Sequence, residues 1–119
     1  MIAIIDYDAG NLTSVARALS NIGVENTVTN DIRQIEKAER IVFPGVGAAG
    51  SAMESLKRLG LDKALKEAFV RGKPVLGICL GSQIILSYSQ ENQTSCLGLM
   101  DGKVCNFSDE FQKNGISGL

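Results

Sequence analysis

The sequence predicts an α/β fold of three layers, in which a mainly parallel sheet lies between flanking helices. Short apolar segments alternate with segments of helical periodicity along most of the chain. The apolar segments suit strands of a buried parallel sheet, and glycine follows several of the predicted helices where a helix would end. Strands that alternate with helices are joined by right-handed crossovers, which place helices against a parallel sheet.

Four strands are expected, at residues 2–6, 24–29, 40–43 and 74–78. The first, IAIID, is an apolar run that ends in an acidic residue. The second, VENTVT, alternates only in part. The third, RIVF, is halted by Pro44 and the glycine-rich GVGAAG, and the fourth leads directly into a cysteine.

Helices are expected between these strands and after the fourth, at residues 12–22, 31–39, 53–59, 61–69 and 80–89. Asn11 is placed to cap the first of them, and Gly23 stands where a helix-terminating glycine belongs. Near the end of the chain, Asp101-Gly102 lies between two short apolar segments. This pattern predicts a hairpin with a type I′ turn.

Composition restricts the class of protein. The 119 residues fit a single domain, and the net charge is −1 with both signs mixed along the chain, which argues against a nucleic-acid or membrane surface. No signal peptide or spanning segment is recognised, and the three cysteines form no C-x-x-C pair. We therefore expect a cytoplasmic protein with free thiols. The chain has no histidine, and we expect neither a metal nor a cofactor.

The cysteine after the fourth strand is the strongest candidate for chemistry. Gly77, Cys79 and Gly81 form a G-x-C-x-G pattern between a predicted strand and a predicted helix, which is the cysteine counterpart of a nucleophile elbow. Glycines on either side relieve crowding in such a sharp turn, and the helix dipole favours the thiolate. The alternative is a small, inert cysteine in a tight turn.

A second loop, residues 44–47 (PGVG), follows the third strand and is called the PGVG loop below. Because it lies at the end of a strand, we expect its N–H groups to face the same edge of the sheet as Cys79. One of them, together with the N–H of Leu80, would form an oxyanion hole. A plain glycine loop that reverses the chain is the alternative.

The segment GVGAAG also fits a dinucleotide-binding G-x-G-x-x-G at Gly45, Gly47 and Gly50. Three features weaken that interpretation. The loop follows the third strand instead of the first, a proline precedes it, and the next strand ends in a cysteine where an acidic residue would hold the ribose.

Four segments together resemble the class I glutamine amidotransferases. They are DYDAGNLTSVARAL (6–19), FPGVGAAGSAM (43–53), KPVLGICLGSQIILSYSQEN (73–92) and LGLMDGKV (97–104). The start D-Y-x-x-G-N-L is similar to the branch of glutaminase subunits that serve histidine biosynthesis. The resemblance runs over almost the whole chain in the right order.

The resemblance implies roles for five residues. Cys79 would attack the side-chain amide of L-glutamine, and Gly47 and Leu80 would belong to the oxyanion hole. Gln83 and Glu91 would hold the backbone groups of glutamine, although either could equally be a solvated residue on a helix surface. Ammonia would pass to a synthase/cyclase subunit, in a heterodimer that makes imidazole glycerol phosphate.

The chain departs from the family pattern at its end. The family completes its site with a histidine and a glutamate in a C-terminal segment, and this chain stops at Leu119, about where that segment should begin. We therefore expect residues 1–119 to be one truncated domain that is inactive by itself. Two alternatives stay open: a non-catalytic domain that binds a partner or glutamine, and a subunit that serves sugar amidation.

Overall fold

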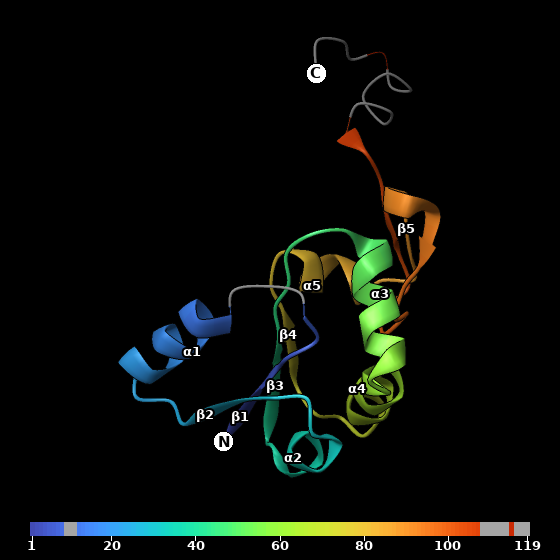
Figure 1. Cartoon of the computed structure of the whole chain (residues 1–119). Helices are drawn as coiled ribbons and strands as arrows, with labels where there is room; N and C mark the ends of the chain where they lie inside the picture. The colour runs from blue at the N-terminus through green and yellow to red at the C-terminus, as the bar shows by residue number, and fades with distance from the viewer. Residues whose placement is uncertain (9–11, 108–114, 116–119) are drawn as a thin grey trace.

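The main sheet of the computed structural model has four parallel strands in the order β2-β1-β3-β4 (Figure 1). The structure describes residues 1–8, 12–107 and 115. The strands are β1 (Ile2–Ile5), β2 (Asn26–Thr29), β3 (Arg40–Phe43) and β4 (Val75–Gly77). Ile4 lies opposite Val28 and Val42, and Phe43 lies opposite Gly77. All four expected strands are present, and the second is two residues shorter at its start.

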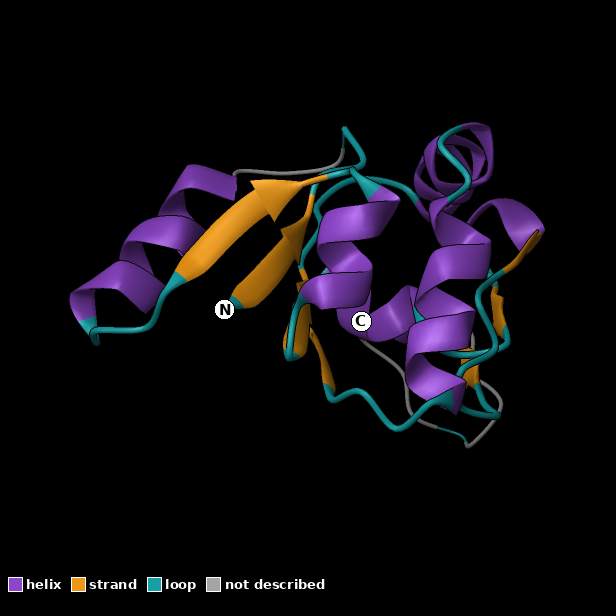
Figure 2. Ribbon diagram, turned by 90° about the horizontal axis from the view of Figure 1, so that it is seen from below, coloured by secondary structure: helices purple, strands orange, loops and turns teal. Residues whose placement is uncertain are grey.

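Helices cover both faces of this sheet, which confirms the three-layer α/β prediction. Helix α1 (Leu12–Asn21) lies against β1 and β2 on one face (Figure 2). Helices α2 (Ile32–Lys37), α3 (Ala49–Arg58) and α4 (Leu61–Val70) form the layer on the other face. The order of the strands follows from these crossovers, because α1 leads outward to β2 and α2 leads back past β1 to β3.

The helices end where the glycines predict. After α1, the N–H of Gly23 donates to the carbonyl of Ser20 at 3.0 Å, and the N–H of Val24 donates to that of Leu19 at 2.9 Å. These two bonds form a Schellman motif around a glycine with a φ of 79°. Helix α4 ends in the same way at Gly72. Asn11, the expected cap of α1, lies outside the described residues.

The core lies between the sheet and the layer of α2, α3 and α4. Its largest fully buried side chains include Tyr7, Phe43, Leu56, Leu61 and Leu65. On the opposite face, none of the side chains of α1 is fully buried. Within the described ranges, no helix has the length and apolar character needed to cross a bilayer.

The segment after β4 differs from the prediction in two respects. Helix α5 (Leu80–Ile84) is half as long as expected, because the chain turns into a second, three-stranded sheet. That sheet contains β5 (Tyr88–Ser89), β6 (Thr94–Ser95) and β7 (Lys103–Val104), and a short 3₁₀ turn, η1 (Glu91–Gln93), precedes β6. The predicted hairpin at Asp101-Gly102 is wrong. Strands β6 and β7 both pair with β5, and β7 pairs with it in parallel.

Candidate active site

Cys79 stands at a sharp turn between β4 and α5, at the carboxyl edge of the parallel sheet. Its backbone has φ 54° and ψ −120°, a conformation that L residues seldom adopt, and its side chain is exposed. The carbonyl of Cys79 accepts a hydrogen bond from the Ser82 hydroxyl at 2.6 Å and from the Ser82 N–H at 2.9 Å. The first turn of α5 therefore fixes the strained peptide and leaves the thiol facing outward.

The two glycines of the elbow are required by their neighbours. A Cβ added at Gly77 would lie 2.8 Å from the Cα of Ser82, and one added at Gly81 would overlap the carbonyl oxygen of Phe43. The expected crowding is confirmed, but its partners differ from those we expected. The glycines make room for the start of α5 and for the end of β3. The nearest contacts of an added Cβ would be with Ser82 and Phe43, and not with Cys79.

The PGVG loop lies beside the elbow, as predicted. The N–H of Leu80 donates to the carbonyl of Gly45 at 3.1 Å, which continues the pairing of β3 with β4 beyond the strands. Gly47 has a φ of 102° and open space where a Cβ would be. One of the two expected oxyanion donors is therefore already bonded within the protein in this structure.

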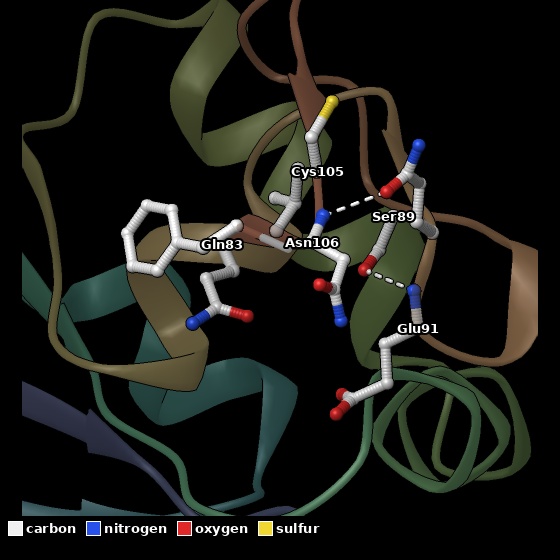
Figure 3. Close-up of a pocket in the computed structure, with 8 residues that line it drawn as sticks. Gln83, Ser89, Glu91, Cys105 and Asn106 are labelled. Carbon is white, nitrogen blue, oxygen red and sulfur yellow. Dashed lines mark hydrogen bonds between the residues drawn. The ribbon is translucent and has the colours of Figure 1, made fainter. Parts of the chain in front are cut away.

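Gln83 and Glu91 line the same pocket, which has a volume of about 360 Å³. Gln83 comes from α5 and Glu91 from η1, and Figure 3 shows them on two sides of the hollow. The other wall is the segment after β7, with Cys105 and Asn106. Cys79 does not line this pocket. It immediately precedes α5, the helix that carries Gln83 four residues further along the chain.

Glu91 also has a structural function that the sequence did not indicate. Helix α3 begins after Ala48, which has no side chain to cap it. The Glu91 carboxylate accepts the N–H of Ala49 at 2.8 Å, and the Asn92 side-chain oxygen accepts the N–H of Gly50 at 3.1 Å. These two acceptors satisfy N–H groups that the helix itself leaves without partners.

The same cap argues against a dinucleotide site at GVGAAG. In such a site the pyrophosphate binds to the N–H groups at the start of the following helix. Here those positions are occupied by the side chains of Glu91 and Asn92. A second anion would be repelled by the carboxylate that is already there.

Several polar residues at the site were not singled out from the sequence. The buried hydroxyl of Ser89 accepts the N–H of Glu91 at 3.1 Å and so positions η1. The buried phenol of Tyr7 donates to the carbonyl of Pro44 at 2.6 Å. Tyr7 belongs to the quoted segment DYDAGN, but its partner is 37 residues away and no local pattern indicates the contact.

Among the described residues, no cluster of three or more His, Cys, Asp or Glu side chains is close enough to hold a metal ion. The thiol of Cys96 packs against the core, and burial raises its pKa. Burial also raises the pKa of Tyr7, so that this phenol stays neutral.

Comparison with known proteins gives a consistent result. A family model described as glutamine amidotransferase class-I matches residues 3–111. The chain is 54% identical over 103 residues to the imidazole glycerol phosphate synthase subunit HisH of Nitratidesulfovibrio vulgaris (strain DSM 19637 / Miyazaki F), an overlap of 87% of this chain and 49% of that protein. It is 49% identical over 111 residues to HisH of Listeria monocytogenes serotype 4a (strain HCC23), covering 92% of this chain and 53% of that protein. The chain thus spans about half the length of these curated relatives.

Two solved structures share the fold. One is a glutamine amidotransferase, with a TM-score of 0.74 and 15% identity, and the match covers 87% of this chain and 55% of that one. The other is a putative peptidase E protein from Listeria monocytogenes, with a TM-score of 0.71 and 19% identity, covering 94% of this chain and 71% of that one. At these identities the match concerns the arrangement of the backbone only.

Proposed function

The chain belongs to the class-I glutamine amidotransferase family, and from that premise we propose that it carries the nucleophile of a glutaminase subunit. The observation that supports this most directly is the elbow, where an exposed Cys79 at φ 54° stands beside the PGVG loop. Strain of about 1–3 kcal/mol at such a position persists where the surrounding structure imposes it, and functional sites are where it concentrates.

In the proposed reaction, the sulfur of Cys79 attacks the carbonyl carbon of the L-glutamine side-chain amide. The carbonyl electrons move to the oxygen, which becomes an oxyanion. When this intermediate collapses, the carbon–nitrogen bond breaks, the nitrogen takes up a proton, and ammonia leaves a glutamyl thioester on Cys79. Water then attacks the thioester, which releases glutamate and regenerates the thiol.

Leu80 would stabilise the oxyanion through its backbone N–H, with Gly47 supplying the second donor. Such donors act on the charge that develops on the oxygen. Because the Leu80 N–H is bonded to the Gly45 carbonyl at 3.1 Å, that bond has to be exchanged for one to the substrate. Gly47 has room to turn, since no neighbouring atom would meet even an added Cβ.

The pocket that contains Gln83 and Glu91 would receive the amino and carboxylate groups of glutamine. Its polar lining suits a small zwitterion, and Gln83 lies on α5, the helix that begins directly after the nucleophile. Glu91 would contribute from the position that it holds as the cap of α3. Both assignments are carried over from the family pattern.

Acid–base catalysis has to come from another source. The 119 residues contain no histidine, and neither protonation of the leaving nitrogen nor activation of water has an evident group in this sequence. We propose that the chain alone does not turn over glutamine. The similarity to HisH subunits favours a synthase/cyclase partner that uses the ammonia to make imidazole glycerol phosphate, in place of sugar amidation.

The test is covalent labelling of the nucleophile, which does not require turnover of glutamine. A chloroketone analogue of glutamine should alkylate Cys79, with loss of chloride, and L-glutamine should compete with the analogue. Mass spectrometry of the peptides locates the label. Cys105→Ala, which removes a thiol that lines the pocket, should still be labelled, whereas Cys79→Ala should not.

Ammonia release should be measured in parallel, with and without a synthase-type partner. No saturable labelling of Cys79 would exclude the glutaminase proposal and favour a domain that only binds. Labelling of Cys79 with ammonia release by the isolated chain would support the nucleophile and overturn the claim that the acid and base are lacking.

A further inference from the structure

Tyr7 follows β1 and is fully buried beneath the PGVG loop. Its side chain is 0% exposed, and its ring packs against Phe43 with the ring centroids 5.0 Å apart. Its hydroxyl donates to the carbonyl of Pro44 at 2.6 Å. Because burial favours the neutral phenol, the hydroxyl keeps the proton that it donates. One buried hydrogen bond therefore ties the first strand to the loop after the third.

This bond also determines where the next carbonyl of the loop points. The carbonyls of Phe43 and Gly45 accept from the N–H groups of Ile78 and Leu80, at 3.0 and 3.1 Å. In an extended chain, successive carbonyls point to opposite sides. The carbonyl of Pro44, between these two, is therefore turned away from Leu80 and toward the buried phenol. A fixed Pro44 carbonyl directs that of Gly45 at the Leu80 N–H.

Direct packing strengthens this coupling. A Cβ at Gly45 would overlap the hydroxyl oxygen of Tyr7 and would lie 3.3 Å from the Cβ of Leu80. Gly45 therefore fills the space between the phenol and the first residue of α5. At interior packing density this part of the loop has no room to shift toward β1.

We propose that the Tyr7 hydroxyl is the positioning group of the PGVG loop. This inference rests on the proposed function, in which the Leu80 N–H serves the oxyanion. Tyr7 does not touch the thiol; it acts through Pro44 and holds the first half of the loop in place. Only the peptides after Gly45 then have to turn when the Leu80 N–H is released to the substrate. Without the hydroxyl the donors lose their fixed placement, on which their effect depends.

The experiment compares two reagents at Cys79 in the 119-residue protein. The glutamine chloroketone places its carbonyl oxygen in the oxyanion site as it reacts, whereas iodoacetamide displaces iodide without forming an oxyanion. We expect Tyr7→Phe to lower the rate with the chloroketone about tenfold and to leave the rate with iodoacetamide within about twofold. Tyr88→Phe, at the other tyrosine, is the matched control and should change neither rate.

Amide hydrogen exchange provides a readout that does not depend on glutamine chemistry. In Tyr7→Phe the Leu80 amide should exchange about tenfold faster, because its acceptor on Gly45 is less well held. The amide of Ile41, which donates to Pro74 at 2.9 Å in the same pair of strands, is the internal reference and should exchange as in the wild type.

The two proposals fail in different ways. If wild-type Cys79 reacts with iodoacetamide but not with the chloroketone, the glutaminase proposal fails, and hydrogen exchange still decides the positioning of the loop. If the wild type reacts with both reagents and Tyr7→Phe changes neither the ratio of rates nor the exchange of Leu80, the role of Tyr7 is overturned. A parallel fall in both rates also overturns it, because a general loosening of the fold would then explain the result.

Discussion

At the scale of single residues, Cys79 occupies a backbone conformation that its side chain disfavours. A non-glycine residue at φ 54° and ψ −120° raises the free energy of the folded state by about 1–3 kcal/mol. The neighbouring elements must therefore hold the residue in this conformation. Bonds from Ser82 to its carbonyl, and the close fit of Gly77 and Gly81, supply that restraint. The elbow therefore stores strain at the residue that carries the exposed thiol.

This strain predicts the order of stability of two variants. Cys79→Gly should be more stable than Cys79→Ala by about 1 kcal/mol, since glycine removes the strain and adds only about 0.5–1 kcal/mol of backbone entropy to folding. Urea denaturation of both variants measures the difference. Because both variants lack the thiol, its loss does not contribute to that difference. An alanine variant that is more stable by about 0.5–1 kcal/mol, the entropic cost of glycine alone, would mean that the turn is not strained.

Burial of Tyr7 predicts a dependence of stability on alkaline pH. The folded state holds the phenol proton above its ordinary pKa of 10.0, so the unfolded chain releases that proton first as the pH rises. Below pH 10 this contribution to stability is fully present. Above pH 10 the free energy of unfolding should fall by up to about 1.4 kcal/mol per pH unit from this one group.

Urea denaturation between pH 9 and 11, in wild type and Tyr7→Phe, checks this. The variant is expected to be less stable at pH 9, by about 1–3 kcal/mol, because the Pro44 carbonyl loses a buried partner. Its stability should then fall less steeply with pH. Parallel curves for the two proteins would show that Tyr7 does not ionise on unfolding.

At the scale of secondary-structure elements, helix α3 depends on a cap from another part of the chain. Glu91 and Asn92 bind the first two N–H groups of α3, 42 residues before them in the sequence. A carboxylate there also interacts favourably with the positive end of the helix dipole. The cap links η1, and with it the pocket wall, to the loop beside Cys79.

Replacing the carboxylate tests this structural function. Glu91→Ala should lower the free energy of unfolding by about 1 kcal/mol, the usual value of a lost cap. Glu91→Gln keeps an oxygen acceptor and should lower the free energy of unfolding by a smaller amount. Glu54→Ala, an exposed carboxylate on α3 itself, is the control and should change stability by less than about 0.5 kcal/mol. If all three variants match the wild type in urea denaturation, Glu91 does not cap the helix.

The elements that were predicted correctly are those that local chemistry specifies. Strand β3 is stopped by Pro44, and α1 is terminated by the turn at Gly23, so a short stretch of sequence determines each boundary. The predicted hairpin does not form because its segments pair with residues elsewhere in the chain. The Ser87 N–H donates to the Gly102 carbonyl at 3.0 Å, and the Ser87 hydroxyl accepts the Gly102 N–H at 3.3 Å. The same contacts account for the early end of α5.

The candidate site shows the same difference between features set by local sequence and contacts made by distant residues. The elbow at Cys79 could be predicted because its sequence pattern, G-x-C-x-G, lies within five residues. The hydrogen bond from Tyr7 and the cap by Glu91 join residues 37 and 42 positions apart, and only the folded chain brings them together. Long-range polar contacts of this kind have no periodicity, so a single sequence does not reveal them.

At the scale of the whole molecule, the two faces of the sheet are covered unequally. One face carries α2, α3 and α4, whereas the other carries α1 over β1 and β2. Among the described residues no strand pairs with the outer side of β4, and Leu76 on that strand is 60% exposed. Beside it lies a hollow of about 200 Å³ with apolar walls, formed by Ile2, Leu19, Val42 and Val75 among others. An open, apolar edge strand is a site of aggregation.

A charge on this edge should therefore reduce the self-association of the 119-residue protein in solution. Leu76→Lys is expected to lower its concentration-dependent association, because a lysine on an edge strand opposes pairing between molecules. Val70→Lys is the matched control: it adds the same charge at a residue 83% exposed on α4, away from the sheet, and should have little effect. Sedimentation velocity over a range of concentrations measures both variants. Equal association of the two would assign the effect to net charge, and unchanged association in Leu76→Lys would show that the β4 edge does not drive self-association.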